Sequence, residues 1–273
     1  QSWPAEWQKW CTVVPIKDFK QQQRVRLGAF GSLSTVAEDT AYTTLSLTDV
    51  QATYSATKRG NLVQISRETI VNDDLQGVKQ IPTKLAIASA YTLAEFVYNF
   101  VLSTNVTNIY DGNVLFTVGG AHNNRGNAAA LTTANVESGV IAMREQTNSA
   151  SKRLGIRPAF LIVPPELEFT ALTIVRSAGI PGSNNNDINP MMGYMDVLVS
   201  PQLTNAAQWV ISADPRVVDT IEVGFVGGQV NPELFIQDNP LYGLNFTQDV
   251  ISYKVRHEYG GAVVDYRGLN SGF

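Results

Sequence analysis

The sequence contains few charged side chains. Lys, Arg, Asp and Glu make up 16% of its 273 residues, whereas roughly a quarter is typical of soluble domains. Thr, Asn, Ser and Gln replace the missing charges. Identical faces with few charges repel one another only weakly, so this composition favours subunits that pack against copies of themselves, although secreted binding domains share it. The net charge of −4 argues against a nucleic-acid reader, which normally carries a basic face.

Cysteine and histidine are almost absent as well. Cys11 is the only cysteine, which excludes an internal disulfide and a multi-cysteine zinc site. The two histidines, His122 and His257, lie in a Gly/Asn-rich loop and in an alternating strand, without a cluster of cysteines or carboxylates around them. No run approaches the ~18 apolar residues that span a bilayer, and no signal-peptide pattern opens the chain. We therefore expect no metal, no cofactor and no membrane partner.

Catalytic motifs are also missing. The sequence holds no GxSxG nucleophile elbow, no phosphate-binding P-loop and no HExxH metal motif. A solvated loop explains Glu38 and Asp39, a helix cap explains Asp73 and Asp74, and Cys11 has no polarising histidine nearby. These absences predict a protein that is not an enzyme. A hydrolase or lectin with an unrecognised site remains an alternative, which predicts a soluble monomer or dimer with a pocket lined by perturbed acids.

Three tryptophans stand in the first ten residues. Trp3, Trp7 and Trp10 follow helical spacing, which places them on one face of an N-terminal helix. Two interpretations stay open: a terminal helix docked on its own domain, or an arm whose aromatic anchors dock on a neighbouring subunit. The chain begins at Gln1 and not at Met, from which we expect proteolytic processing of a longer precursor, although an edited sequence would look the same.

Residues 24–70 predict a long two-stranded hairpin. Residues 50–57 alternate apolar and polar side chains, as in a sheet that is wet on one side. A turn at 58–60 leads to a second run at 61–66, and residues 24–27 supply a partner strand. A hairpin of this kind is only marginally stable alone. We therefore expect it to rest on another body, which in a structural protein is a neighbouring copy.

The rest of the chain mixes helices and strands. The longest predicted helix covers residues 82–103, roughly 33 Å at the α-helical rise. Thr133 is expected to cap a second helix, and a buried strand at 160–163 ends at two prolines that open a third helix. Strands follow at 196–199, 209–211 and 220–225, and the chain closes with two strands joined at the glycine pair 260–261. The pattern predicts an α+β fold with a compact α/β region.

Three long strings carry a resemblance to a known family. They are NDDLQGVKQIP at 72–82, RLGIRPAFLIVPPEL at 153–167 and RHEYGGAVVDYRG at 256–268. In this order they resemble the major capsid proteins of tailed bacteriophages, and more closely the subset encoded as fusions behind a prohead protease domain. The resemblance runs from about residue 17 to 268 and leaves out the Trp-rich first ten residues. It is far more specific than a short catalytic motif.

The resemblance implies the tailed-phage major capsid fold and a division of the chain. Residues 1–23 would form an N-terminal arm, and residues 24–70 an extended hairpin loop that lies across a neighbouring subunit. Residues 71–130 and 241–273 would form a peripheral domain with the helix at 82–103 as its spine. Residues 131–240 would form an axial domain around the capsomer axes. Gln1 would be the terminus left when a scaffolding or protease-bearing portion is removed.

The function implied by the resemblance is structural. Copies of the chain would form hexamers and pentamers, a homo-oligomer that closes an icosahedral shell around packaged double-stranded DNA without reading its sequence. Portal, scaffold or protease and decoration proteins are further expected partners. The expected location is the capsid of the virion, with assembly in the host cytoplasm. An encapsulin-type nanocompartment shell is the alternative within the same fold.

Inter-subunit contacts are expected in the arm and the hairpin. Some relatives join their subunits through Lys–Asn isopeptide bonds, for which Lys58 and the abundant asparagines would be available, but the sequence offers no recognisable acid catalyst. The residues expected to touch a neighbouring subunit are Trp3, Trp7, Trp10, Glu38, Asp39, Tyr42, Tyr54, Lys58 and Arg59.

Overall fold

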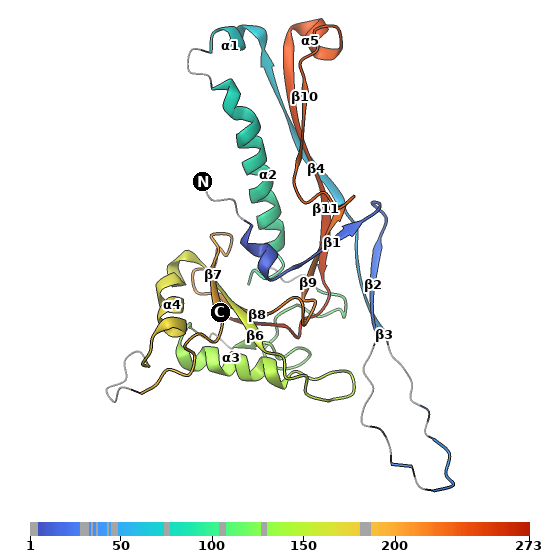
Figure 1. The fold of residues 1–273 in the computed structure, drawn as a ribbon, viewed down its shortest axis with the longest axis vertical. Coiled ribbons are helices and arrows are strands. Elements are labelled where there is room, and N and C mark those ends of the chain that lie inside the picture. The colour runs from blue at the N-terminus through green and yellow to red at the C-terminus, as the bar shows by residue number, and fades with distance from the viewer. Residues whose placement is uncertain are drawn as a thin grey trace.

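The protein extends in three directions from one junction. A narrow blade, a rounded α/β body and the two paired strands of a hairpin meet there (Figure 1). The computed structural model describes residues 5–27, 33, 35–36, 38–42, 44, 49–73, 77–103, 108–126, 130–180 and 187–273. Trp3 and Asp74 therefore lie outside the described residues, as does most of the loop at 179–189.

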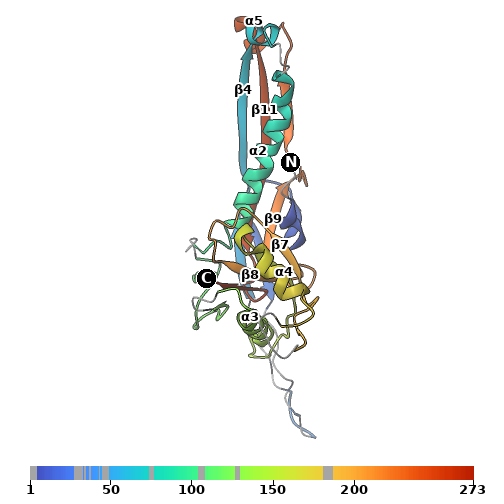
Figure 2. The same ribbon diagram turned by 90° about the vertical axis from the view of Figure 1, so that its left-hand side faces the viewer.

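The blade is organised around one long strand, β11 (Val250–Val263). On one edge β11 pairs antiparallel with β4 (Thr57–Ser66). On its other edge it pairs with β10 (Glu233–Gln237) and then with β9 (Ile221–Val226). β1 (Thr12–Ile16) adds to β9 in parallel. Two short helices, α1 (Arg67–Val71) and α5 (Gly243–Gln248), lie at the far end of the blade (Figure 2).

The helix α2 (Ile81–Tyr98) runs along the blade (Figure 1). The Asp73 carboxylate accepts hydrogen bonds from the backbone N–H groups of Gly77 and Val78, at 2.8 and 2.9 Å. It thereby caps the short 3-10 turn η2 (Val78–Gln80) that leads into α2, as the sequence predicted for this residue. The predicted end at residue 103 is wrong. The amides of Phe100 and Val101 bond three residues back, which tightens the last turn and ends the helix.

The body is a second five-stranded sheet, in the order β5-β12-β8-β6-β7. Helix α3 (Thr133–Glu145) starts after the cap Thr132, whose hydroxyl accepts from the Asn135 amide, one residue before the predicted cap. Helix α4 (Glu168–Arg176) follows the two prolines and the 3-10 turn η3 (Pro165–Leu167), as expected. The strands are β5 (Arg125–Gly126), β12 (Leu269–Gly272), β8 (Trp209–Ala213), β6 (Pro158–Val163) and β7 (Asp196–Val199).

The two sheets do not coincide with the segments expected from the sequence, because strands cross between them. β9 and β10 lie inside the predicted axial segment 131–240, yet both pair with β11 in the blade. β5 and β12 lie in the predicted peripheral segments, yet both belong to the sheet of the body. These partners are far apart along the chain, so no local pattern reveals the exchange.

The glycine pair 260–261 is not a turn, and the prediction of two strands joined there is wrong. β11 continues through both residues. A Cβ on Gly260 would overlap the backbone of Ser55 and Ala56, and a Cβ on Gly261 would lie 2.6 Å from the carbonyl oxygen of Glu222. The pair is needed because neighbouring backbones approach β11 from both sides at this point.

The first residues of the described chain pack into the chain's own core. Trp7 and Trp10 are 1% and 0% exposed. The Trp7 ring lies 6.2 Å from that of Phe225 on β9, and the Trp10 ring lies 5.5 Å from that of Tyr98 on α2. The segment forms a 3-10 turn, η1 (Glu6–Lys9), and not the expected helix. Of the two interpretations left open by the sequence, docking on the chain's own domain is the one observed for Trp7 and Trp10.

Candidate functional site

The hairpin stands apart from both five-stranded sheets. β2 (Gln22–Leu27) and β3 (Asp49–Tyr54) pair with each other and form a separate two-stranded sheet. The predicted extent of 24–70 is too long, because 57–66 is the blade strand β4 and the predicted turn at 58–60 lies inside it. Among the described link residues, Glu38, Asp39 and Tyr42 are exposed, Tyr42 by 86%. These three are available for contact with another molecule.

A buried carboxylate fastens the root of the hairpin. Nε of Arg24 on β2 lies 2.6 and 2.7 Å from the two carboxylate oxygens of Glu222 on β9. The Tyr54 hydroxyl donates to the same carboxylate. Glu222 is only 5% exposed. Burial, followed by the hydrogen bond to Glu222, raises the pKa of Tyr54 above its ordinary value, so the hydroxyl stays a donor.

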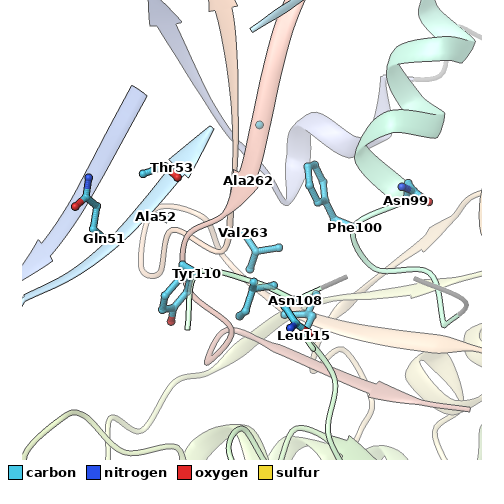
Figure 3. A pocket seen from close by; sticks show the side chains of 12 residues that line it. Gln51, Ala52, Thr53, Asn99, Phe100, Asn108, Tyr110, Leu115, Ala262 and Val263 are labelled. Atoms are coloured by element: carbon cyan, nitrogen blue, oxygen red, sulfur yellow. The ribbon is translucent and has the colours of Figure 1, made fainter. Parts of the chain in front are cut away.

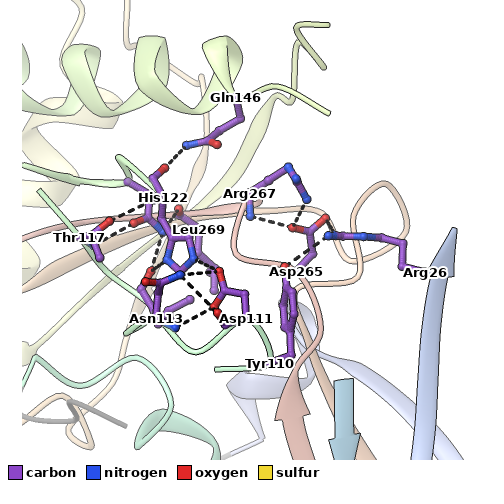
Figure 4. A network of polar contacts seen from close by, with 12 residues as sticks. Arg26, Tyr110, Asp111, Asn113, Thr117, His122, Gln146, Asp265, Arg267 and Leu269 are labelled. Carbon is purple, nitrogen blue, oxygen red and sulfur yellow. Dashed lines mark hydrogen bonds and ion pairs between the residues drawn. The ribbon is translucent and has the colours of Figure 1, made fainter. Parts of the chain in front are cut away.

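A second ionic contact lies two residues further along β2. Arg26 forms an ion pair with Asp265, in the connection between β11 and β12, and donates to the Tyr110 hydroxyl at 3.3 Å. Asp265 also accepts from Arg267 at 3.3 Å (Figure 4). Burial raises the pKa of Tyr110 to about 12. Two arginines on one face of β2 thus connect the hairpin to the blade and to the chain segment that enters the body.

Tyr54, one of the predicted inter-subunit contacts, packs within its own chain. It is 7% exposed, and its ring lies over Gly224 on β9, where an added Cβ would come within 2.6 Å of the Tyr54 hydroxyl oxygen. The side chain therefore holds the hairpin on the chain's own blade.

Arg59 also has an internal role that the sequence did not predict. Its guanidinium carbon lies 4.6 Å from the ring centroid of Phe96 on α2 and 4.4 Å from that of Tyr259 on β11. These cation–π contacts bind the helix to the sheet. Lys58 is exposed, opposite Glu258 in the β4–β11 register. It therefore belongs to the blade and not to the hairpin, but it remains open to a neighbour.

Both histidines are held by internal partners. His122 Nε2 lies 2.6 Å from an Asp111 carboxylate oxygen and Nδ1 lies 2.9 Å from the Leu115 carbonyl oxygen (Figure 4). Burial would raise the pKa of Asp111, but hydrogen bonds from His122 and Asn113 outweigh it and lower the pKa. His257 Nε2 lies 3.0 Å from the Val230 carbonyl oxygen, and burial lowers its pKa. Both rings serve the fold.

The described residues provide little for chemistry. They contain no group of three or more His, Cys, Asp or Glu side chains placed to hold a metal ion. Cys11 is buried, and burial raises the pKa of its thiol well above the ordinary value, which disfavours the nucleophilic thiolate. In the described part of the chain, no helix is long and apolar enough to cross a membrane.

A depression of about 430 Å³ lies between β3, the end of α2 and the segment after residue 108 (Figure 3). Its described lining offers the amides of Gln51, Asn99 and Asn108 and the hydroxyls of Thr53 and Tyr110, and it includes no carboxylate, histidine or cysteine side chain. Such a lining can bind a polypeptide segment through hydrogen bonds, but it supplies no general base at neutral pH.

A comparison with protein families gives a match over most of the chain. A family described as "Phage capsid protein" matches residues 49–269. A comparison with curated proteins finds no match.

Three solved structures of similar fold are described as capsids. The capsid of a native GTA particle has a TM-score of 0.66 at 12% identity, covering 100% of this chain and 90% of that chain. The capsid of cyanophage P-SCSP1u has a TM-score of 0.65 at 13% identity, covering 96% and 86%. The capsid of bacteriophage JBD30 has a TM-score of 0.63 at 16% identity, covering 74% and 92%. At these identities the likeness concerns the fold.

Proposed function

The chain belongs to the phage capsid protein family and is a structural major capsid protein, and on this premise we propose that its copies close an icosahedral shell. The shell is built from hexamers and pentamers and encloses packaged double-stranded DNA, and the protein catalyses no reaction. The family match over residues 49–269 carries the proposal, because it includes the blade, α2 and the body together. The family match also favours a virus shell over a nanocompartment.

The hairpin, the blade and the body are proposed to have different roles within the shell. The hairpin lies across a neighbouring subunit and touches it through Glu38, Asp39 and Tyr42, which are exposed in the isolated chain. The blade and α2 form the peripheral domain, and the body forms the axial domain around capsomer axes. Domain roles therefore follow the two sheets and not the linear segments expected from the sequence.

Assembly of such a shell needs only weak contacts. Each interface between two copies contributes modestly, and closed symmetry multiplies these contributions until the whole particle hardly dissociates. The low charged fraction of 16% keeps repulsion between identical faces small. The net charge of −4 fits a shell that encloses DNA without binding it by a basic surface.

The proposal also includes maturation of the chain and its partner proteins. We propose that processing from a longer precursor precedes the mature state. Portal, scaffold or protease and decoration proteins complete the particle, which assembles in the host cytoplasm. Isopeptide joining through Lys58 is not part of the proposal, because Lys58 lies in the blade opposite Glu258 and not in the hairpin.

The test is microscopy of the purified chain together with light scattering at rising protein concentration. Closed polyhedral particles, or stable rings of five or six subunits, are the expected result. A monodisperse species of 29.8 kDa at every concentration, from protein with an intact N-terminus, contradicts the proposal and favours a binding protein or a hydrolase.

A further inference from the structure

The strand β10 forms an open edge of the blade. It ends the strand order β1-β9-β11-β10, so β11 is its partner on one side while its other side is free of strands within the described residues. Apart from the ladder to β11, residues 233–237 take part in no backbone–backbone hydrogen bond of the described chain. Edges of this kind are a template for pairing with another chain unless they are blocked.

This edge lacks most of the usual blocking devices, and its one charged residue is Glu233. It contains no lysine, no proline and no bulge. Three consecutive apolar residues are exposed instead: Leu234 by 41%, Phe235 by 39% and Ile236 by 52%. Phe235 shares one face with Lys254 and Arg256, whose cationic groups lie 4.5 and 4.9 Å from its ring centroid. Leu234 and Ile236 lie on the opposite face, because side chains alternate along a strand.

The order of side chains in β10 is self-complementary. A two-fold axis perpendicular to a sheet keeps each residue on its own face, so residues that oppose each other across the axis have the same parity. The register that pairs the whole of residues 233–237 is centred on Phe235. It places Phe235 opposite its own copy, Leu234 opposite Ile236, and Glu233 opposite Gln237. Apolar residues then meet apolar residues, and no two like charges face each other.

Moving the centre of the pairing by one residue, which shifts the register by two residues, is less favourable. Centred on Leu234 or Ile236, the pairing leaves part of β10 unpaired and sets apolar residues opposite polar ones. With Phe235 at the centre, the only anion in the strand, Glu233, meets an amide. Glu233 is also bound to Arg256, whose Nε donates to its carboxylate at 3.0 Å. Its charge is therefore balanced within its own subunit.

We propose that β10 pairs antiparallel with β10 of a second copy across a two-fold axis, which joins two blades into one continuous sheet. The inference rests on the proposed shell, since it identifies one face by which copies meet. Six strands then run without interruption from β4 of one subunit to β4 of the other. The contact joins subunits through main-chain hydrogen bonds and apolar side-chain pairs, independently of the hairpin.

Disulfide trapping tests the register directly. Opposed residues in an antiparallel pair have Cα atoms about 4.5 to 5.5 Å apart, within the range of about 4.4 to 6.8 Å that a disulfide bridges. The variant Phe235→Cys, exposed to a mild oxidant, is expected to give a covalent dimer linked between the two residues 235. Leu62→Cys is the matched control: Leu62 is 54% exposed on β4, at the opposite edge of the same sheet. The native Cys11 is buried and contributes no background.

Lysine substitution gives a second measure that does not depend on oxidation. Ile236→Lys is expected to reduce the assembled fraction by about tenfold, because two added cations meet near the axis and an edge lysine disfavours strand pairing. Leu62→Lys, at a site of similar exposure, is expected to change it less than about twofold. Far-ultraviolet circular dichroism of both variants shows whether the fold is retained.

The outcomes separate this inference from the proposed function. If particles form but no 235–235 crosslink appears, the β10 pairing is overturned and the proposed shell function is still supported. A second variant carries an additional cysteine in the hairpin. If Cys at position 235 crosslinks only to that second cysteine, the β10 pairing is also overturned, because β10 then pairs with a different segment. A 235–235 dimer in a protein that forms no particles supports the pairing and contradicts the shell.

Discussion

At the residue scale, charged groups help to fasten the hairpin. Arg24 meets Glu222 on β9 and Arg26 meets Asp265 near the entry to the body. Alternating arginines in β2 are visible in the sequence, but their partners lie about 200 and about 240 residues away. Only the folded chain shows that these arginines anchor the hairpin to its own subunit.

The carboxylate at the root is expected to control stability. Glu222→Gln leaves Arg24 without an anionic partner in a mostly buried setting and should lower the free energy of unfolding by about 1–3 kcal/mol. Urea unfolding measures the loss. Glu145→Gln is the control, because its pair with Arg153 is exposed and should cost less than about 0.5 kcal/mol. Equal losses in the two variants would contradict the role of Glu222.

Asp111 is expected to contribute to acid sensitivity. Hydrogen bonds from His122 and Asn113 hold its pKa below the ordinary 3.8 in the folded state. A lowered folded-state pKa means that the stabilisation is complete above the unfolded-state pKa and is lost as pH falls through the folded-state pKa. Asp111→Asn should therefore flatten the decline of unfolding free energy below about pH 4. Urea unfolding of both proteins at a series of pH values measures this decline.

At the element scale, glycines allow the backbones of neighbouring strands to approach each other closely. Gly224 lies under the Tyr54 ring, and the glycine pair 260–261 lies where 55–56 and β9 meet β11. The sequence alone indicated a turn at 260–261, because a glycine pair between two strand-like runs is typical of one. The strand continues instead because its glycines admit the neighbouring chains.

Substitution at Gly224 tests this packing. Gly224→Ala is expected to displace Tyr54, weaken its bond to Glu222 and lower the unfolding free energy by about 1–3 kcal/mol. In a Tyr54→Ala background the same change should cost much less, since the ring that it meets has been removed. A double-mutant cycle by urea unfolding measures the coupling. Additive losses would show that Tyr54 does not occupy the space above Gly224.

At the scale of the whole molecule, the two sheets share one hydrophobic core. Trp7, Trp10, α2, β9 and β11 pack there with Ile162 and Val210 of the body. The blade and the body are therefore expected to unfold together, whereas the exposed hairpin link can change without cost to the fold.

The combined variant Glu38→Lys, Asp39→Lys, Tyr42→Ser separates folding from assembly. All three side chains are exposed, so the unfolding free energy should stay within about 0.5 kcal/mol of the unmodified chain. Assembly should fall sharply, because reversed charges and a lost aromatic ring disrupt the contact with a neighbour. Light scattering and urea unfolding give the two measurements. Normal assembly would remove these residues from the inter-subunit contacts.

The sequence by itself determined the α+β class, the long helix, the α/β body and the capsid family, because these depend on periodicity, capping and long ordered strings. It also located the acidic link, whose residues 38–42 are exposed. Only the tertiary structure decided that Trp7, Trp10, Tyr54 and Arg59 face inward. It also decided which sheet β9, β10 and β12 join. The reason is physical. Aromatic and cationic side chains suit a core contact and an interface equally well, and the choice depends on partners that the fold brings from distant parts of the chain.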